Sequence, residues 1–208
     1  MPDVANIEDS AKLWCSIYNI KMDVIEKAKE IASYAHRNHV RNDDAKTPYV
    51  QHLAEVADLV RESGGTESEI AAAWLHDTVE DTHITIDDIR KEFSEEIAEI
   101  VAGLTDMPEW TTLSLAERKA RQAKRVSKES SSIRRVKLAD QASNVQIVGK
   151  KKLDSTTDKK ITYIMGAKKI AEACKGVSAY LDTSFEERYQ TAFKILKESK
   201  AQQEFKSA

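Results

Sequence analysis

The chain has 208 residues, of which 41% are hydrophobic and 32% are charged, and it contains only 6 Gly and 3 Pro. This length fits one compact domain, and because sandwiches and barrels need many Gly- or Pro-marked turns, the composition disfavours an all-β fold and excludes collagen-like and Pro/Gly-rich disordered chains. The net charge of −3 conceals a division, since residues 1–117 hold 25 acidic and 10 basic side chains and residues 118–175 hold 5 acidic and 17 basic ones. Such an asymmetry is typical either of a surface that binds polyanions or of solvated helix faces.

Apolar residues recur at helical spacing along almost the whole chain, which predicts helices throughout. Thr47-Pro48 is expected to begin a helix that ends at Gly64-Gly65, and capping-box patterns are expected to begin further helices at Thr66, Thr85, Ser114 and Ser184. The predicted helices cover residues 22–39, 47–63, 67–81, 85–93, 94–104, 114–128, 131–147, 157–175 and 184–203, followed by a polar, frayed tail. We therefore predict an all-α, single-domain fold of eight to ten helices over residues 1–208.

Several features predict a cytoplasmic protein that does not enter a membrane. The N-terminal residues MPDVANIEDSAKLW are acidic and lack the apolar region of a signal peptide. No apolar run approaches the roughly 18 residues that span a bilayer. Cys15 and Cys174 are far apart and form no CxxC pattern, so neither a disulfide framework nor a thiolate metal site is expected.

The most informative segment begins as a buried helix and becomes strongly polar. The apolar run 71–75 leads directly into His76-Asp77-Thr78-Val79-Glu80-Asp81. On a continuous helix, residues four apart share a face, so His76 would lie beneath Glu80 and Asp77 beneath Asp81. Three carboxylates at the end of a buried helix are costly unless a cation compensates them, and His and Asp are both common metal ligands. The alternative is an ordinary helix terminus whose acidic end points into water.

Two other predicted helices each offer a ligand-type side chain in an apolar setting. His52 lies among Val50, Leu53 and Val56, and Asp140 ends the run VKLAD, with Asn144 four residues later on the same face. Taken alone, His52 would be a core histidine and Asp140 a helix cap or an ion-pair partner. Together with His76 and Asp77, however, they make a four-ligand metal site that leaves positions open for water. Glu80 and Asp81 would lie one turn away, where they can orient or deprotonate that water.

These residues resemble a known family. The H…HD…D pattern is that of the HD-domain metal-dependent phosphohydrolases, and it is most similar to the RelA/SpoT-type (p)ppGpp hydrolases and their stand-alone relatives, the small alarmone hydrolases. The resemblance covers about residues 22–180 and rests on a set of strings in family order, namely AH (35–36) with Arg41, TPYVQH (47–52), LHDTVEDT (75–82), GLTD (103–106), ERK (117–119) and VKLAD (136–140) with Asn144.

The resemblance implies a role for each of these side chains. His52, His76, Asp77 and Asp140 would bind one divalent ion, Mn²⁺ in the characterised relatives. Glu80 and Asp81 match the catalytic acidic pair that activates a metal-bound water. The implied substrate-binding residues are Arg41 near the nucleotide base, Asn144, and the basic and aromatic pair Lys159 and Tyr163.

The chain also departs from the family pattern. Leu53 stands where the family usually has Pro, and Asn42 stands where it usually has Lys. Near Asn144, the neutral Gln141 and Gln146 replace expected basic residues. The catalytic set is thus complete, whereas the substrate choice stays open.

The predicted function is metal-dependent hydrolysis of the 3′-pyrophosphate of guanosine tetra- or pentaphosphate, ppGpp or pppGpp, giving pyrophosphate and GDP or GTP. The alternatives are a (p)ppApp hydrolase, an NADPH phosphatase or another HD-type nucleotide phosphohydrolase. A non-enzymatic nucleic-acid-binding module is disfavoured, because no aromatic residue interleaves the basic run 118–137 as a stacking platform would. We therefore expect a small polyphosphorylated nucleotide as partner. The sequence carries no pattern that indicates an oligomeric state, and the apolar residues of the last helix are expected to pack in the core.

Overall fold

The computed structural model describes residues 23–43, 45–150 and 155–207, and within these ranges the chain forms helices and loops but no sheet. An isolated antiparallel bridge between Val40 and Pro48 closes the loop between α2 (Val24–Ala35) and α3 (Val50–Glu62). The predicted all-α fold is therefore confirmed. Cys15 and the N-terminal residues considered above lie outside the described ranges, and the prediction of a single domain over residues 1–208 stays a prediction.

The first half of the chain forms short helices, most of which begin at a capping side chain. Thr66 and Thr85 each accept a hydrogen bond from the N–H three residues later, and the carboxylates of Glu69 and Asp88 accept one from the backbone N–H of the capping residue, so both predicted capping boxes are confirmed. A helix N-terminus has unpaired N–H groups, and these side chains satisfy them. The helices are α2 Val24–Ala35, α3 Val50–Glu62, α4 Glu67–Leu75, α5 Thr78–Asp81, α6 Ile86–Glu92 and α7 Glu95–Leu104.

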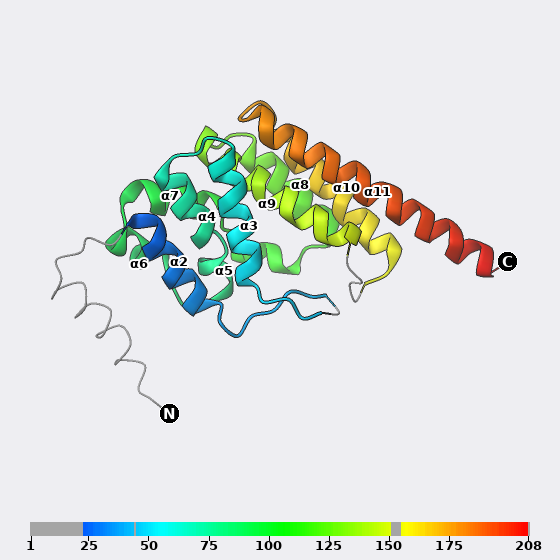
Figure 1. The fold of residues 1–208 in the computed structure, drawn as a ribbon, viewed down its shortest axis with the longest axis horizontal. Helices are drawn as coiled ribbons and strands as arrows, with labels where there is room; N and C mark the ends of the chain where they lie inside the picture. Colours follow the sequence, from blue (N-terminus) through cyan, green and yellow to red (C-terminus); the bar gives the residue numbers. More distant parts are fainter. Residues whose placement is uncertain (1–22, 44, 151–154, 208) are drawn as a thin grey trace.

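The second half consists of longer helices that pack lengthwise. A short 3₁₀ helix, η1 Pro108–Thr112, leads into α8 Leu115–Val126, α9 Ser131–Lys150, α10 Thr157–Cys174 and α11 Ala179–Ser207. The predicted capping box at Ser114 and Glu117 is confirmed at the start of α8. Helix α9 contacts α3, α4, α10 and α11, and it therefore joins the two halves (Figure 1).

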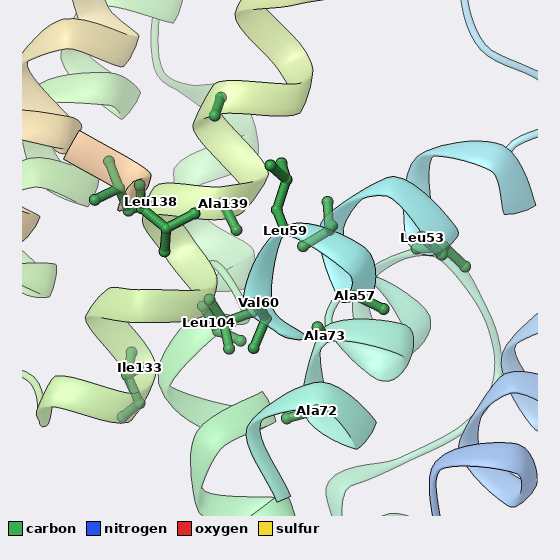
Figure 2. Close-up of a cluster of buried hydrophobic side chains, with 14 of the residues drawn as sticks. Leu53, Ala57, Leu59, Val60, Ala72, Ala73, Leu104, Ile133, Leu138 and Ala139 are labelled. Atoms are coloured by element: carbon green, nitrogen blue, oxygen red, sulfur yellow. The ribbon is translucent and has the colours of Figure 1, made fainter. Parts of the chain in front are cut away.

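Figure 2 shows the part of the core where α3, α4, α7 and α9 meet. Leu53, Ala57, Ala73 and Leu138 are fully buried there. The three alanines of α4 at positions 71–73 are also fully buried, and their small side chains let the neighbouring helices approach α4 closely. The last helix packs as predicted, because Phe185, Tyr189 and Leu196 are buried and Phe193 is partly buried against the core.

Several predicted helix boundaries are wrong. Thr47 does not cap α3, because its hydroxyl donates to Oδ2 of Asp43 at 2.7 Å and the helix begins only at Val50. Ser184 lies inside α11, which begins earlier because Oγ of Ser178 accepts a hydrogen bond from the N–H of Leu181 at 3.4 Å. Helix α11 also continues to Ser207, since residues 197–207 contain neither Gly nor Pro to end it.

The polar segment after α4 is not one continuous helix. Helix α4 ends at Leu75 and α5 begins at Thr78, so His76 and Asp77 form a two-residue break. Nδ1 of His76 hydrogen-bonds to the carbonyl oxygen of Ala73 at 2.7 Å, the oxygen that would accept from the N–H of Asp77 in a continuous helix. The predicted pairing of His76 with Glu80 on one helix face is therefore replaced by a break that presents His76 and Asp77 together.

In the part of the chain that the structure describes, every helix is either too short or too polar to cross a bilayer.

Candidate metal centre and nucleotide pocket

The four predicted metal ligands come from three places in the fold. His52 lies in the first turn of α3, His76 and Asp77 form the break between α4 and α5, and Asp140 lies in the middle of α9. Both imidazoles and Asp140 are buried, and Asp77 is partly exposed. The contacts of α3 and α4 with α9 bring these segments together.

The ligand atoms of these four residues converge. Nε2 of His76 lies 3.0 Å from Oδ2 of Asp77 and 3.9 Å from Oδ1 of Asp140. Nε2 of His52 lies 3.7 Å and 3.5 Å from the same two oxygens. One ligand atom from each of His52, His76 and Asp140 lies within 4.8 Å of the others, as in a group able to hold one cation. The structure thus brings all four predicted ligands together, and the cluster with its HD-type pattern indicates a divalent metal site.

The hydrogen bonds of the two imidazoles test whether this cluster fits a cation. Nδ1 of His76 is held by the carbonyl oxygen of Ala73, and Nδ1 of His52 lies 2.9 Å from Oγ of Ser143. In a neutral imidazole with a protonated Nδ1, Nε2 carries a free lone pair, and here both Nε2 atoms face the carboxylates. Nε2 of His76 is buried without a hydrogen-bond partner. A lone pair that faces carboxylate oxygens is stabilised by a cation between them, so the donor set fits a divalent metal.

The charges of the cluster are strongly coupled. Burial lowers the pKa of His76, but the carboxylates of Asp77 and Asp140 outweigh this effect and raise the pKa to about 9. Burial raises the pKa of Asp140, but the ammonium of Lys137 and the two imidazoles hold it well below its usual value. For His52, burial is the largest effect and lowers the pKa. Without a cation, a proton on His76 therefore balances part of the negative charge, and a metal would compete with that proton.

Three side chains fix the orientation of the Asp140 carboxylate. Nδ2 of Asn144 donates to Oδ1, and Nε2 of Gln141 donates to Oδ2 at 2.8 Å. Nζ of Lys137 lies 3.3 Å from Oδ2. Gln141 in turn accepts a hydrogen bond from the buried Lys119 at 3.1 Å. Asp140 is thereby held by groups from α8 and α9 before any metal binds.

The two predicted catalytic carboxylates lie on α5, directly after Asp77. Oε1 of Glu80 accepts a hydrogen bond from the backbone N–H of Asp106 at 2.5 Å. Although its side chain reaches solvent, desolvation by the surrounding protein raises the pKa of Glu80 to about 7, and the negative charge of Asp77 adds to the shift. The same two causes raise the pKa of Asp81. A carboxylate with a pKa near neutrality is suited to proton transfer.

The four predicted substrate-binding residues line one pocket beside the metal cluster. Arg41, Asn144, Lys159 and Tyr163 are among the residues around a space of about 290 Å³ between the loop after α2 and helices α9 and α10. Arg41 donates to Oδ1 of Asn144 at 2.6 Å, and Asn144 donates to Asp140, so this pocket adjoins the cluster directly. A larger cavity of about 460 Å³ lies elsewhere, between α7 and the start of α9, and contains none of these residues.

Comparisons with known proteins agree with this geometry. The profile of the HD domain matches residues 28–173, which is more than half of the chain. The chain belongs to the HD-domain family. The match contains the HD dipeptide His76-Asp77 and the other two members of the cluster.

Two relatives of this chain share one name. The chain is 31% identical over 162 residues to the guanosine-3′,5′-bis(diphosphate) 3′-pyrophosphohydrolase MESH1 of Xenopus tropicalis, and the match covers 76% of this chain and 89% of that protein. The MESH1 protein of Danio rerio is 31% identical over 182 residues, with 86% and 95% of the two chains covered. A solved structure described as a metazoan ortholog of SpoT that hydrolyzes ppGpp is 28% identical, with a TM-score of 0.75 over 82% of this chain and 96% of that one.

Several residues around the HD site were not predicted from the sequence. Tyr49 donates from its hydroxyl to Oδ2 of Asp77 at 2.5 Å, Ser143 holds His52, and Lys137 and Gln141 hold Asp140. Lys137 offered a signal, because it is a charged residue three positions before Asp140 in an apolar helix, and on a helix that spacing places two side chains together. Ser143 offered none, since a small hydroxyl residue in a helix is common.

Proposed function

We propose that this HD domain is a metal-dependent hydrolase that removes the 3′-pyrophosphate of ppGpp or pppGpp and releases pyrophosphate and GDP or GTP. The observation that carries the proposal is the convergence of two imidazole Nε2 atoms and two carboxylates next to a pocket lined by Arg41 and Lys159. The names of the MESH1 relatives support the same substrate and the same bond.

His52, His76, Asp77 and Asp140 would hold one divalent ion, which we propose to be Mn²⁺. When bound, such an ion supplies Lewis-acid activation of water and compensates negative charge on phosphate oxygens. Tyr49 keeps the Asp77 carboxylate turned toward the cluster, and Asn144, Gln141 and Lys137 do the same for Asp140. The ligand geometry is therefore prepared by protein hydrogen bonds.

Glu80 would accept the proton of the attacking water. Its raised pKa lets it take that proton near neutral pH, and the backbone N–H of Asp106 fixes the carboxylate in position. Asp81, on the same short helix, would supply the second carboxylate of the pair. Because the chemistry needs the unprotonated form of Glu80, the proposal predicts a loss of activity at acidic pH.

The pocket would hold the nucleotide. Arg41 and Lys159 would neutralise the charge of the phosphates, and Tyr163 would offer an aromatic face to the base. Asn144 would link the nucleotide to the proposed ligand Asp140, to which it donates a hydrogen bond. These assignments stay proposals, as do the choice of guanine over adenine, the cytoplasmic location and the absence of nucleic-acid and membrane partners.

The test is a product assay on the Mn²⁺-loaded protein. The substrates are ppGpp, pppGpp, the adenosine analogue and NADPH, and released pyrophosphate and orthophosphate are quantified separately. We expect pyrophosphate from the guanosine compounds and loss of activity after chelation. Orthophosphate from NADPH as the main product, or no hydrolysis of ppGpp, would refute the assignment.

A variant separates metal binding from proton transfer. Glu80→Gln should retain bound Mn²⁺ and lose turnover by about 10²- to 10⁴-fold, the usual contribution of a general base. The matched control is Glu67→Gln, an exposed glutamate in the first turn of α4, and it should leave turnover unchanged. Wild-type turnover in Glu80→Gln would show that this carboxylate is not the base.

A further inference from the structure

A chain of side-chain contacts joins the ligand His52 to the last helix. Nδ1 of His52 lies 2.9 Å from Oγ of Ser143, and this hydroxyl donates to Oε2 of Glu55 at 2.7 Å. The other oxygen of Glu55 accepts a hydrogen bond from Arg188 at 2.7 Å. The four residues come from α3, α9 and α11. Ser143 is fully buried, whereas the ion pair of Glu55 and Arg188 at the other end is only partly buried.

The donors and acceptors along this chain fix the position of one proton. A serine hydroxyl has a single proton, and a carboxylate paired with an arginine only accepts. The Ser143 proton therefore points to Glu55, so Oγ can only accept from His52, and Nδ1 of His52 must carry a proton. The free lone pair of the neutral imidazole is then on Nε2, the atom that faces Asp77 and Asp140.

We propose that Ser143, Glu55 and Arg188 are positioning residues that hold His52 in its metal-binding tautomer, so that α11 contributes to cation affinity. The proposal rests on the metal site proposed above. It extends that site to a helix that begins after the residues matched by the family profile. Outer hydrogen-bond partners of a ligating histidine fix its ring and raise its basicity, and their loss commonly weakens metal binding.

The two histidines differ in how they are held, which makes the relay specific to His52. His76 is fixed by the backbone carbonyl of Ala73, which no side-chain substitution removes. His52 depends on three side chains, of which two lie near the surface. Substitution of the distant Arg188 should therefore change the cation site although this residue touches neither a ligand nor the nucleotide pocket.

The test measures Mn²⁺ binding by calorimetry to the full chain after metal removal. We expect Ser143→Ala to raise the Mn²⁺ dissociation constant by about 10- to 100-fold, and Arg188→Gln by roughly three- to tenfold, because it acts through two intervening hydrogen bonds. The control is Glu186→Gln, which removes another α11 contact, the 3.5 Å ion pair with Lys168 of α10 that lies outside the relay. It should bind Mn²⁺ as the unaltered chain does.

Two further readouts distinguish positioning from general support of the fold. The effects of Ser143→Ala and Arg188→Gln on the dissociation constant should not add in the double variant, since both break the same relay. Long-range ¹⁵N spectra should show His52 protonated on Nδ1 in the unaltered chain and in Arg188→Lys, which retains the positive charge. If Ser143→Ala and Arg188→Gln both bind Mn²⁺ with unaltered affinity, the positioning role of the relay is wrong and the proposed metal site is unaffected. Absence of Mn²⁺ binding by the unaltered chain would overturn the metal site as well.

Discussion

His36 should make the stability of this fold depend on pH. It follows α2, its side chain is 1% exposed, and its ring stacks on Tyr49 with 5.2 Å between centroids. Nδ1 of His36 lies 3.0 Å from Nδ1 of His39, and Nε2 is buried without a hydrogen-bond partner. Burial has the largest effect and lowers the pKa of His36, the charge of Asp77 opposes it, neighbouring imidazoles add to it, and the result is a pKa of about 4. The folded protein thus binds a proton at this site far less readily than the unfolded chain.

The size of the effect follows from the two pKa values. A histidine whose folded pKa lies below its unfolded value of 6.5 stabilises the fold above pH 6.5, and this contribution is lost as the pH falls toward the folded pKa of about 4. At 1.36 kcal/mol for each pH unit of difference, the full contribution is about 3 kcal/mol, of which about 2 kcal/mol is lost between pH 7 and pH 5.

Urea unfolding of the chelator-treated protein at pH 7 and pH 5 measures this loss. Because other histidines also titrate, the comparison is with His36→Phe, which keeps a ring against Tyr49 and cannot be protonated. The unaltered chain should lose about 2 kcal/mol more unfolding free energy between the two pH values than the variant does. A proton NMR titration of His36 should show a midpoint near pH 4. An equal pH dependence in both proteins, or a midpoint near 6.5, would refute the reasoning.

Three other results are expected. Gly166→Ala should lower the unfolding free energy by about 1 kcal/mol in thermal or urea denaturation, because a Cβ would lie 2.7 Å from Cβ and Cγ of Lys119, and overpacking outweighs the gain in helix propensity. The pH–rate profile of ppGpp hydrolysis should fall toward acid with a midpoint at or below about 7, since a bound cation lowers the pKa of Glu80; a flat profile between pH 5 and pH 8 would contradict the role of Glu80. Arg41→Lys should raise KM by roughly tenfold or more at unchanged kcat, because it removes a guanidinium contact in the pocket; an unchanged KM would place the substrate elsewhere.

Local signals in the sequence predicted most of the helices. Thr66, Thr85 and Ser114 each have a carboxylate three residues later, and each begins a helix as expected, because the capping box uses only neighbouring atoms. Ser184 has the same pattern with Glu187, yet α11 begins at Ala179, after the earlier capping residue Ser178. The earlier start adds Leu181 to helix α11, and its fully buried side chain favours the longer helix.

The candidate site was predictable in its residue types and not in its geometry. His52, His76, Asp77 and Asp140 were predicted as ligands of one metal ion; the distances place the four side chains together, and their role as ligands stays a prediction. The break between α4 and α5 was not predicted, since neither Gly nor Pro marks the end of a helix in residues 71–81. On an unbroken helix adjacent residues point about 100° apart, yet here Nε2 of His76 and Oδ2 of Asp77 lie 3.0 Å from each other.

The supporting contacts could not be predicted because they join residues that are distant in sequence. Tyr49 meets Asp77 and Ser143 meets His52 only after α3, α4 and α9 have packed together. No local pattern marks such partners. They depend on the crossing of helices, which a single sequence without its fold does not reveal.

The hydrogen bond from the N–H of Asp106 to Glu80 has a consequence for how this enzyme tolerates mutation. The donor belongs to the main chain, while the Asp106 side chain is engaged separately by Gln122 at 2.6 Å. Almost any residue at position 106 would still supply the same N–H, and only proline lacks it. The hydrogen bond that holds Glu80 should therefore survive most substitutions at position 106. Functional relatives could differ at this position while Glu80 keeps the same role.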